Sequence, residues 1–206
     1  MMAQPDIEKT KLLLDRGAQV NGRSKSKYSA LMLACLFPGA APAVRLMLDR
    51  GAEMHSPKGA GAPLYNASPL MLASFSGNAD LIGPLMHAGA RLDEKMLVLG
   101  MFPNSATANA IAFGDLATTR ALLDAGADPN EADDAGFTLP YDAVIGNHTE
   151  VARLPIERGA DVNAVDACGM TPLLYARTKE GLTAQDLARK YGHTYLAASF
   201  VSSSLR

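Results

Sequence analysis

Tryptophan is absent from the 206 residues, aromatic residues make up only 6%, and no apolar run approaches the roughly 18 residues needed to cross a membrane. The N-terminal stretch MMAQPDIEKTK has no apolar core and is therefore not a secretory signal. With 48% hydrophobic and 19% charged residues, the composition is that of an ordinary soluble protein. We therefore expect no membrane partner, and among the compartments we favour the cytoplasm.

Residues that could carry chemistry are few and scattered. No Cys-x-x-Cys or His-Glu-x-x-His pattern occurs, so the spacing offers no metal site. The GAGAP stretch at 59–63 lacks the strand and helix that frame a nucleotide loop. Cys35 and Cys168 are expected to be small buried thiols. The four histidines lie at least 32 residues apart: His55, His87, His148 and His193. We expect no enzymatic activity, no cofactor and no metal.

The chain has little excess of either sign of charge: 19 Lys and Arg residues against 21 Asp and Glu residues give a formal net charge of −2. This balance is not basic enough to indicate nucleic acid as a partner. It hides an asymmetry, because residues 1–60 hold nine Lys/Arg against five Asp/Glu, whereas residues 115–166 hold three against eleven. Two interpretations remain open: a solvated surface, or attraction of a partner with the opposite polarity.

What the sequence does contain is a six-residue motif in five similar copies, each of which closes a unit of the chain: RGAQVN, RGAEMH, AGARLD, AGADPN and RGADVN. The separations between successive glycines of these copies are 34, 38, 37 and 33 residues. A near-constant period in this range predicts a stack of repeats. The glycines are Gly17, Gly51, Gly89, Gly126 and Gly159.

The segment 133–163 shows the expected anatomy of one repeat. DDAG is a tight-turn sequence in which Gly136 supplies a positive φ, and Thr138 is a candidate N-cap for a short helix. Asn147 lies where the chain must reverse in a left-handed conformation. HTEVARLPIER then predicts a second helix that ends at Gly159. Neither helix is long enough to be stable alone, so the two must stack on neighbouring repeats.

These units resemble the ankyrin repeat. The resemblance rests on GMTPLLYA (169–176), ASPLMLASFSGNADLI (67–82), ALLDAGADPN (121–130) and GNHTEVARLPIERGADVN (146–163). It implies an all-α, ankyrin-type helical-repeat solenoid whose hairpin tips and first helices line a concave face. The family's first-helix histidine is missing, and its hydrogen bonds should be missing too. Pro84 and Pro155 should kink or shorten second helices. The histidine slots hold Met32, Met71, Ala108, Tyr141 and Leu174.

We expect a single array over 1–206. Its parts are an N-terminal half repeat (1–21), full repeats at 22–55, 56–93, 94–130 and 131–163, and a C-terminal repeat with a capping helix (164–206). The half repeat is either a cap or the edge of a fragment of a larger protein. Two connections, 56–66 and 94–104, are longer than the pattern requires. The second contains the apolar stretch MLVLGMF, which should fold back and bury Leu97, Leu99 and Phe102.

The residues just before the inter-helix turns form the candidate binding site. Successive repeats place Phe37, Phe75, Phe113 and Ile145 there, and Tyr28 and Phe137 lie at hairpin tips. These side chains are either anchors for a partner or a secondary core beneath the long connections. The acidic tip residues Glu131, Asp133 and Asp134 are further candidates.

The leading hypothesis is a monomeric, non-catalytic scaffold or adaptor that binds a protein partner through its concave face. One alternative is a fragment of a larger protein whose activity lies elsewhere. Another is a small-ligand site formed by the loops 56–66 and 94–104.

Overall fold

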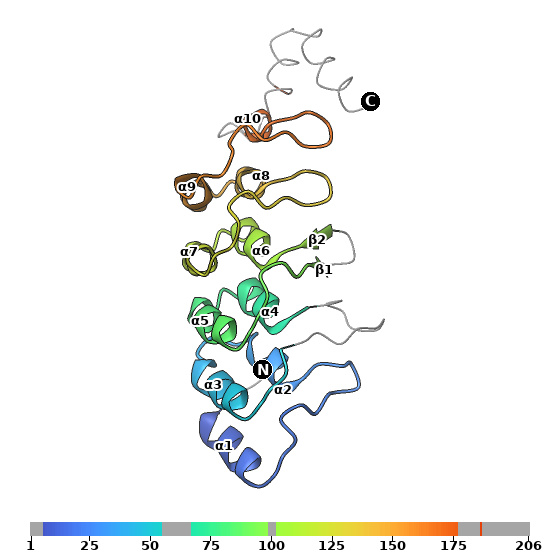
Figure 1. Ribbon diagram of the computed structural model, residues 1–206, viewed down its shortest axis with the longest axis vertical. Helices are drawn as coiled ribbons and strands as arrows, with labels where there is room; N and C mark the ends of the chain where they lie inside the picture. The colour runs from blue at the N-terminus through green and yellow to red at the C-terminus, as the bar shows by residue number, and fades with distance from the viewer. Residues whose placement is uncertain (1–5, 55–66, 99–101, 177–185, 187–206) are drawn as a thin grey trace. The chain divides into compact units, whose positions relative to one another are not determined.

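The computed structural model describes residues 6–54, 67–98, 102–176 and Asp186, and every structural statement below concerns these residues. Helices alternate with turns along the chain (Figure 1). They are α1 (Ile7–Asp15), α2 (Ala30–Ala34), α3 (Ala41–Asp49), α4 (Pro69–Phe75), α5 (Ala79–His87), α6 (Ala106–Ala112), α7 (Leu116–Asp124), α8 (Leu139–Ile145), α9 (Thr149–Glu157) and α10 (Pro172–Tyr175).

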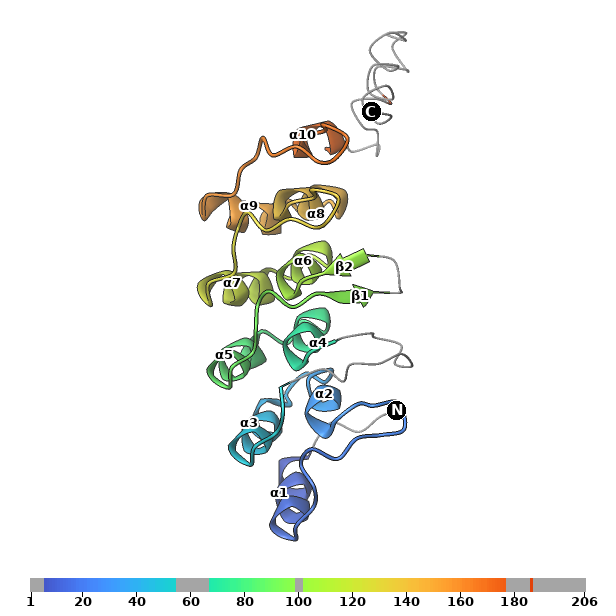
Figure 2. The same ribbon diagram turned by 45° about the vertical axis from the view of Figure 1, so that its right-hand side comes forward.

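The predicted helical-repeat fold is confirmed, with one short addition. Strands β1 (Met96–Val98) and β2 (Phe102–Asn104) pair antiparallel, with Met96 opposite Asn104 and Val98 opposite Phe102 (Figure 2). The long connection 94–104 therefore contains a small hairpin. The predicted burial of Leu97, Leu99 and Phe102 lies outside what the structure describes, as does the connection 56–66. The helices expected over 182–193 and 194–203 also lie outside it.

The chain divides into two compact units, of which the first comprises Met1–Ala110 and Ala117–Ala127. In it α3 packs on α1 and α5 packs on α3, while α4 packs on α2, so first helices and second helices form two layers (Figure 1). The core between them is apolar and fully enclosed, and burial of this kind is the main force that holds short helices in place. Its largest members include Leu31, Met32, Leu70, Met71, Leu72, Ile82 and Leu85.

The second unit comprises Ile111–Leu116 and Asp128–Arg206. Here α8 and α9 form a hairpin, and α10 packs on α8 (Figure 2). Leu139, Val151 and Leu154 are buried in its core. Tyr141, which is fully buried, adds a polar atom: its hydroxyl accepts from the N–H of Asp166 at 3.2 Å and lies 3.4 Å from the Ala164 carbonyl oxygen. Tyr141 stands where the family has its first-helix histidine, so at this position a tyrosine makes the hydrogen bonds to the following repeat.

Local sequence signals place the helix ends. Ser29, Ser68 and Ser105 each accept a hydrogen bond from the backbone N–H three residues later, which satisfies a donor that the helix itself leaves open. Thr138 takes the same position before α8, but its hydroxyl makes no such bond. Asn147 adopts the predicted left-handed conformation with φ 57°, and all five glycines of the repeated ending have positive φ.

Pro84 and Pro155 do not shorten their helices, and the alternative expectation of a kink stays a prediction. Helices α5 and α9 contain these prolines and still run for 9 residues, the same length as α3. Each proline removes a single hydrogen bond. Packing of the buried Leu85 in α5 and of Leu154 in α9 holds the surrounding turns in place. Tertiary burial outweighs the local penalty here.

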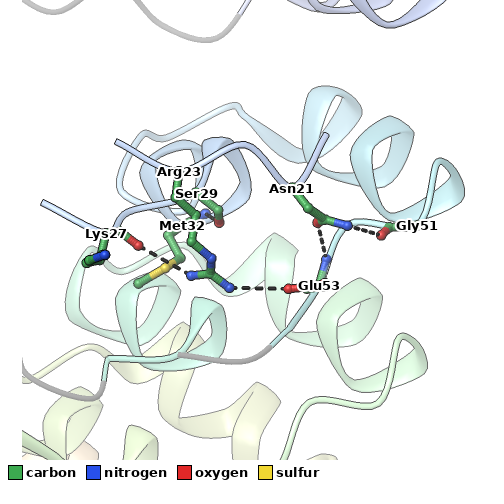
Figure 3. Close-up of polar contacts among 7 residues, drawn as sticks. All are labelled: Asn21, Arg23, Lys27, Ser29, Met32, Gly51 and Glu53. Atoms are coloured by element: carbon green, nitrogen blue, oxygen red, sulfur yellow. Dashed lines mark hydrogen bonds and ion pairs between the residues drawn. The ribbon is translucent and has the colours of Figure 1, made fainter. Parts of the chain in front are cut away.

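The asparagine that closes a repeat ties it to the next repeat. Asn21 donates to the Gly51 carbonyl at 3.0 Å and accepts from the Glu53 N–H at 2.8 Å (Figure 3). In the second unit, Asn130 donates to the Gly159 carbonyl at 3.2 Å and accepts from the Asp161 N–H at 2.7 Å. The amide side chain of asparagine offers both the donor and the acceptor that such a bridge requires.

Candidate protein-binding surface

The apolar side chains predicted as anchors lie at the ends of first helices or shortly after them. Phe75 is 38% exposed, Phe113 is 56% exposed and Ile145 is 52% exposed. Phe37 is half-buried. Large apolar side chains with this much accessible surface are candidates for contact with another protein. Phe75, Phe113 and Ile145 are therefore exposed enough to contact a partner, as the anchor interpretation requires.

In the first unit, hydrogen bonds between successive repeats fix the turns that carry Phe37 and Phe75. The Asn78 side chain donates to the Cys35 carbonyl oxygen at 2.7 Å, and the Ser76 hydroxyl donates to the same oxygen at 3.2 Å. Cys35 itself is fully buried, and burial raises the pKa of its thiol to about 12. It therefore acts as a structural residue rather than as a reactive one. Cys168 is half-buried rather than buried.

In the second unit, a histidine fixes the turns that carry Phe113 and Ile145. Nε2 of His148 donates to the Ala112 carbonyl at 3.0 Å. The ring leaves no room for a side chain above it, because a Cβ added at Gly114 would lie 2.5 Å from His148 Nδ1. Gly114 also has φ +73°. The two turns are thus held against each other, and Phe113 and Ile145 project from neighbouring positions.

The other predicted aromatic residues, Tyr28 and Phe137, lie at hairpin tips. Tyr28 is half-buried, and the tip that carries it is closed by a single bridge between Arg23 and Ser29. Phe137 packs edge-on against Tyr141 and Tyr175, with ring centroids 5.1 Å and 5.9 Å apart. Phe137 thus contributes to an aromatic cluster inside the second unit, in addition to its partial exposure at the tip. Single-sequence reasoning did not foresee this cluster, because Tyr175 is separated from Phe137 by a whole repeat.

The acidic tip is partly structural. Oδ1 of Asp133 accepts from the backbone N–H groups of Ala135 and Phe137, both at 2.9 Å, and so fixes the turn. Glu131 is half-buried and Asp134 is exposed. These contacts explain why Asp133 is needed for the fold of the tip.

One residue that the sequence analysis missed lies on helix α8. Asp142 is half-buried on α8, and its carboxylate has no hydrogen-bond partner among the described residues. Burial, and then the charges of Asp133 and Glu131, raise the pKa of Asp142 to about 8. The fourth residue after the cap is Leu33 or Leu72 in two earlier repeats and the buried, polar Asn109 in the third. A half-buried carboxyl without a described hydrogen-bond partner at this position is an exception that indicates a special role.

Other classes of site find little support within the described residues. These residues contain no group of three or more His, Cys, Asp or Glu that could hold a metal ion. None of the helices described is both long and apolar enough to cross a membrane. A hollow of about 530 Å³ lies between α3 and α5, lined by Arg45, Pro84 and His87 among others.

Paired short helices, capped by serines and tied to the next pair through asparagine and histidine side chains, define a helical-repeat protein. The model of the ankyrin repeat family, described as three copies of the repeat, matches residues 107–192. The chain is an ankyrin-repeat protein, as the resemblance predicted.

Known proteins resemble different parts of the chain. An L-asparaginase of Dirofilaria immitis is 29% identical over 182 residues, which cover 88% of this chain and 29% of the relative. An ankyrin repeat-containing protein of Schizosaccharomyces pombe is 39% identical over 69 residues, covering 34% of this chain and 32% of the relative. Cyclin-dependent kinase 4 inhibitor B of Mus musculus is 33% identical over 84 residues, covering 41% and 64%. The chain thus spans less than a third of the first two relatives.

Proposed function

We propose that this chain is a non-catalytic interaction module that binds a protein partner. The contact surface is the side formed by first helices, hairpin tips and inter-helix turns, which in the family is the concave side. The observation that carries the proposal is the exposure of Phe75, Phe113 and Ile145 at, or one residue after, the ends of the first helices of three repeats. Side chains that are exposed in the free protein and become buried in the complex contribute most of the binding energy of protein interfaces.

The family supports a role in protein binding, because ankyrin repeats generally mediate contacts between proteins. The name of the mouse relative describes an inhibitor of a protein kinase, which is a role carried out by binding. The L-asparaginase relative raises a catalytic alternative. The chain covers only 29% of that relative, so the relative's name does not assign a catalytic role to this chain. We further propose that the chain acts as a monomer and does not bind nucleic acid.

Capture of partners by the intact chain, compared among variants, tests the proposal. Phe113→Ala and Ile145→Ala should each weaken binding of a captured protein by about thirtyfold, the effect of losing an anchor worth roughly 2 kcal/mol. Ile156→Ala is the matched control, since Ile156 is 44% exposed but lies on the second helix α9. Thermal melts separate anchors from core residues, because truncating a core phenylalanine costs about 3–5 kcal/mol of stability. Equal binding by all three variants would contradict the proposal.

A further inference from the structure

Two unusual features occur on the same side of α8. Ile145 is 52% exposed at the end of this helix, and Asp142 lies three residues earlier, so the two side chains share a face. The tip that carries Asp133 and Glu131 is close enough to influence the Asp142 carboxyl. Apolar and acidic groups therefore adjoin on one surface of the second unit, which we call the α8 surface: Phe113, Glu131, Asp133, Asp142 and Ile145.

The Asp142 carboxylate is poorly accommodated by the chain alone. It is half-buried, it has no hydrogen-bond partner among the described residues, and the nearby charges of Asp133 and Glu131 repel it. Leu72, at the equivalent position of α4, is completely buried and well packed. A carboxyl that weakens the fold at a position where leucine fits is the kind of residue that a binding site retains. A positive charge placed here would remove both the burial penalty and the repulsion.

We propose that the α8 surface binds a basic peptide segment of a partner protein, in which Lys or Arg side chains meet Asp142 and Asp133 and apolar side chains cover Ile145 and Phe113. This inference rests on the proposed protein-binding function and adds the chemistry of the partner. Charge complementarity selects this occupant: three of the five residues of the α8 surface are acidic, Glu131, Asp133 and Asp142, and none is basic. Complementary charge contributes to specificity and to the rate of association.

A bare metal ion is a poorer fit to the same carboxylates. The described residues contain no group of three acidic or other ligating side chains with the geometry of a metal site. The adjoining exposed Ile145 would gain nothing from an ion, whereas a peptide can use the charge and the apolar area together. A guanidinium or ammonium group on a flexible stem reaches a recessed carboxylate and covers apolar surface with its own methylenes.

The test uses the full chain and a phage-displayed library of random 12-residue peptides, selected at pH 8. Wild-type protein is compared with Asp142→Asn, with Ile145→Ala and with the control Glu157→Gln, which removes one exposed acidic residue from α9. Enriched peptides are then synthesised, and their affinities are measured by fluorescence anisotropy. We expect peptides rich in Lys or Arg beside apolar residues. They should bind Asp142→Asn about tenfold more weakly than wild type and Glu157→Gln equally well.

The outcomes separate this inference from the function on which it rests. Peptides that depend on Ile145 but show no preference for Lys or Arg, or that bind Asp142→Asn as tightly as wild type, would overturn the inference and leave the protein-binding function standing. A selection that yields no peptide dependent on Ile145 would count against both. Equal weakening by Glu157→Gln and Asp142→Asn would show general attraction to an acidic protein, and would also overturn the inference.

Discussion

Two hairpins of the same design differ in what fills the first helix. In α4 every residue from Pro69 to Ser74 is buried, and Ser68 caps the helix with a hydrogen bond. In α8 the corresponding stretch contains the half-buried Asp142, and the hydroxyl of the cap residue Thr138 is buried without a partner among the described residues. Both helices end at an exposed apolar residue, Phe75 in α4 and Ile145 in α8. The same repeat backbone thus accommodates a first helix that is buried along its length or one that includes a half-buried carboxyl group. The α4–α5 hairpin is built for stability, whereas the α8–α9 hairpin retains groups that weaken it.

The largest loss of stability is expected for a substitution in α4, which is buried from Pro69 to Ser74. Leu72→Ala removes a fully buried side chain from α4 and should lower the free energy of unfolding by about 3 kcal/mol. Urea denaturation of the variant measures the loss. The equivalent change in the other hairpin, Asp142→Ala, should cause no loss. Comparable destabilisation by both changes would remove the distinction between the two hairpins.

The next effect depends on pH. Because the pKa of Asp142 is raised to about 8 in the folded chain, folding favours its protonated form. The resulting penalty is absent below the ordinary Asp value of about 4, grows as the pH rises, and is complete above pH 8. Asp142→Asn should therefore add about 1–3 kcal/mol of stability at pH 8 and much less at pH 5. Denaturation at the two pH values provides the comparison, and an equal gain at both would contradict it.

The asparagine bridges should contribute similarly in both units. Asn130→Ala removes two hydrogen bonds to the following repeat and should cost about 1–2 kcal/mol, with Asn21→Ala alike. Asp93 provides the natural contrast, since it stands at the closing position but is paired with Arg91 at 2.6 Å. Denaturation of Asp93→Ala should show a loss below 1 kcal/mol, as is usual for an exposed ion pair. A larger loss at Asp93 than at Asn130 would show that the bridge is unimportant.

The smallest expected difference lies at the helix caps. Ser68→Ala deletes a formed capping bond and should cost about 1 kcal/mol. Thr138→Ala deletes a hydroxyl that makes no capping bond, so its thermal midpoint should stay close to that of wild type. Should both alanine variants melt at the same lowered temperature, Thr138 would have to be capping α8 in solution.

Much of this fold could be predicted from the sequence, because its signals are local. The repeated Gly17-type ending, the serine caps and Asn147 each specify a backbone conformation within a few residues. The pairing of β1 with β2 was not predicted, because the apolar residues of MLVLGMF were expected to fold back and become buried. The tolerance of Pro84 and Pro155 also escaped prediction, because it depends on packing between repeats.

The candidate site divides in the same way. Phe75, Phe113 and Ile145 could be located by register, since the residue before each turn is fixed by the repeat. Asp142 was overlooked because its significance comes from Asp133 and Glu131 on a different segment, and from partial burial that no single sequence displays. The Phe137–Tyr141–Tyr175 cluster likewise joins two repeats, so only the folded chain shows it.

The most direct test measures stability and binding on one variant, Asp142→Asn, at pH 8. Its unfolding free energy and its affinity for a Lys/Arg-rich peptide selected on the wild-type chain are compared with those of wild type. If α8 retains its carboxyl for binding, the variant will be more stable and will bind the peptide about tenfold more weakly. A variant that is no more stable than wild type, or that binds the peptide as tightly, would contradict the account.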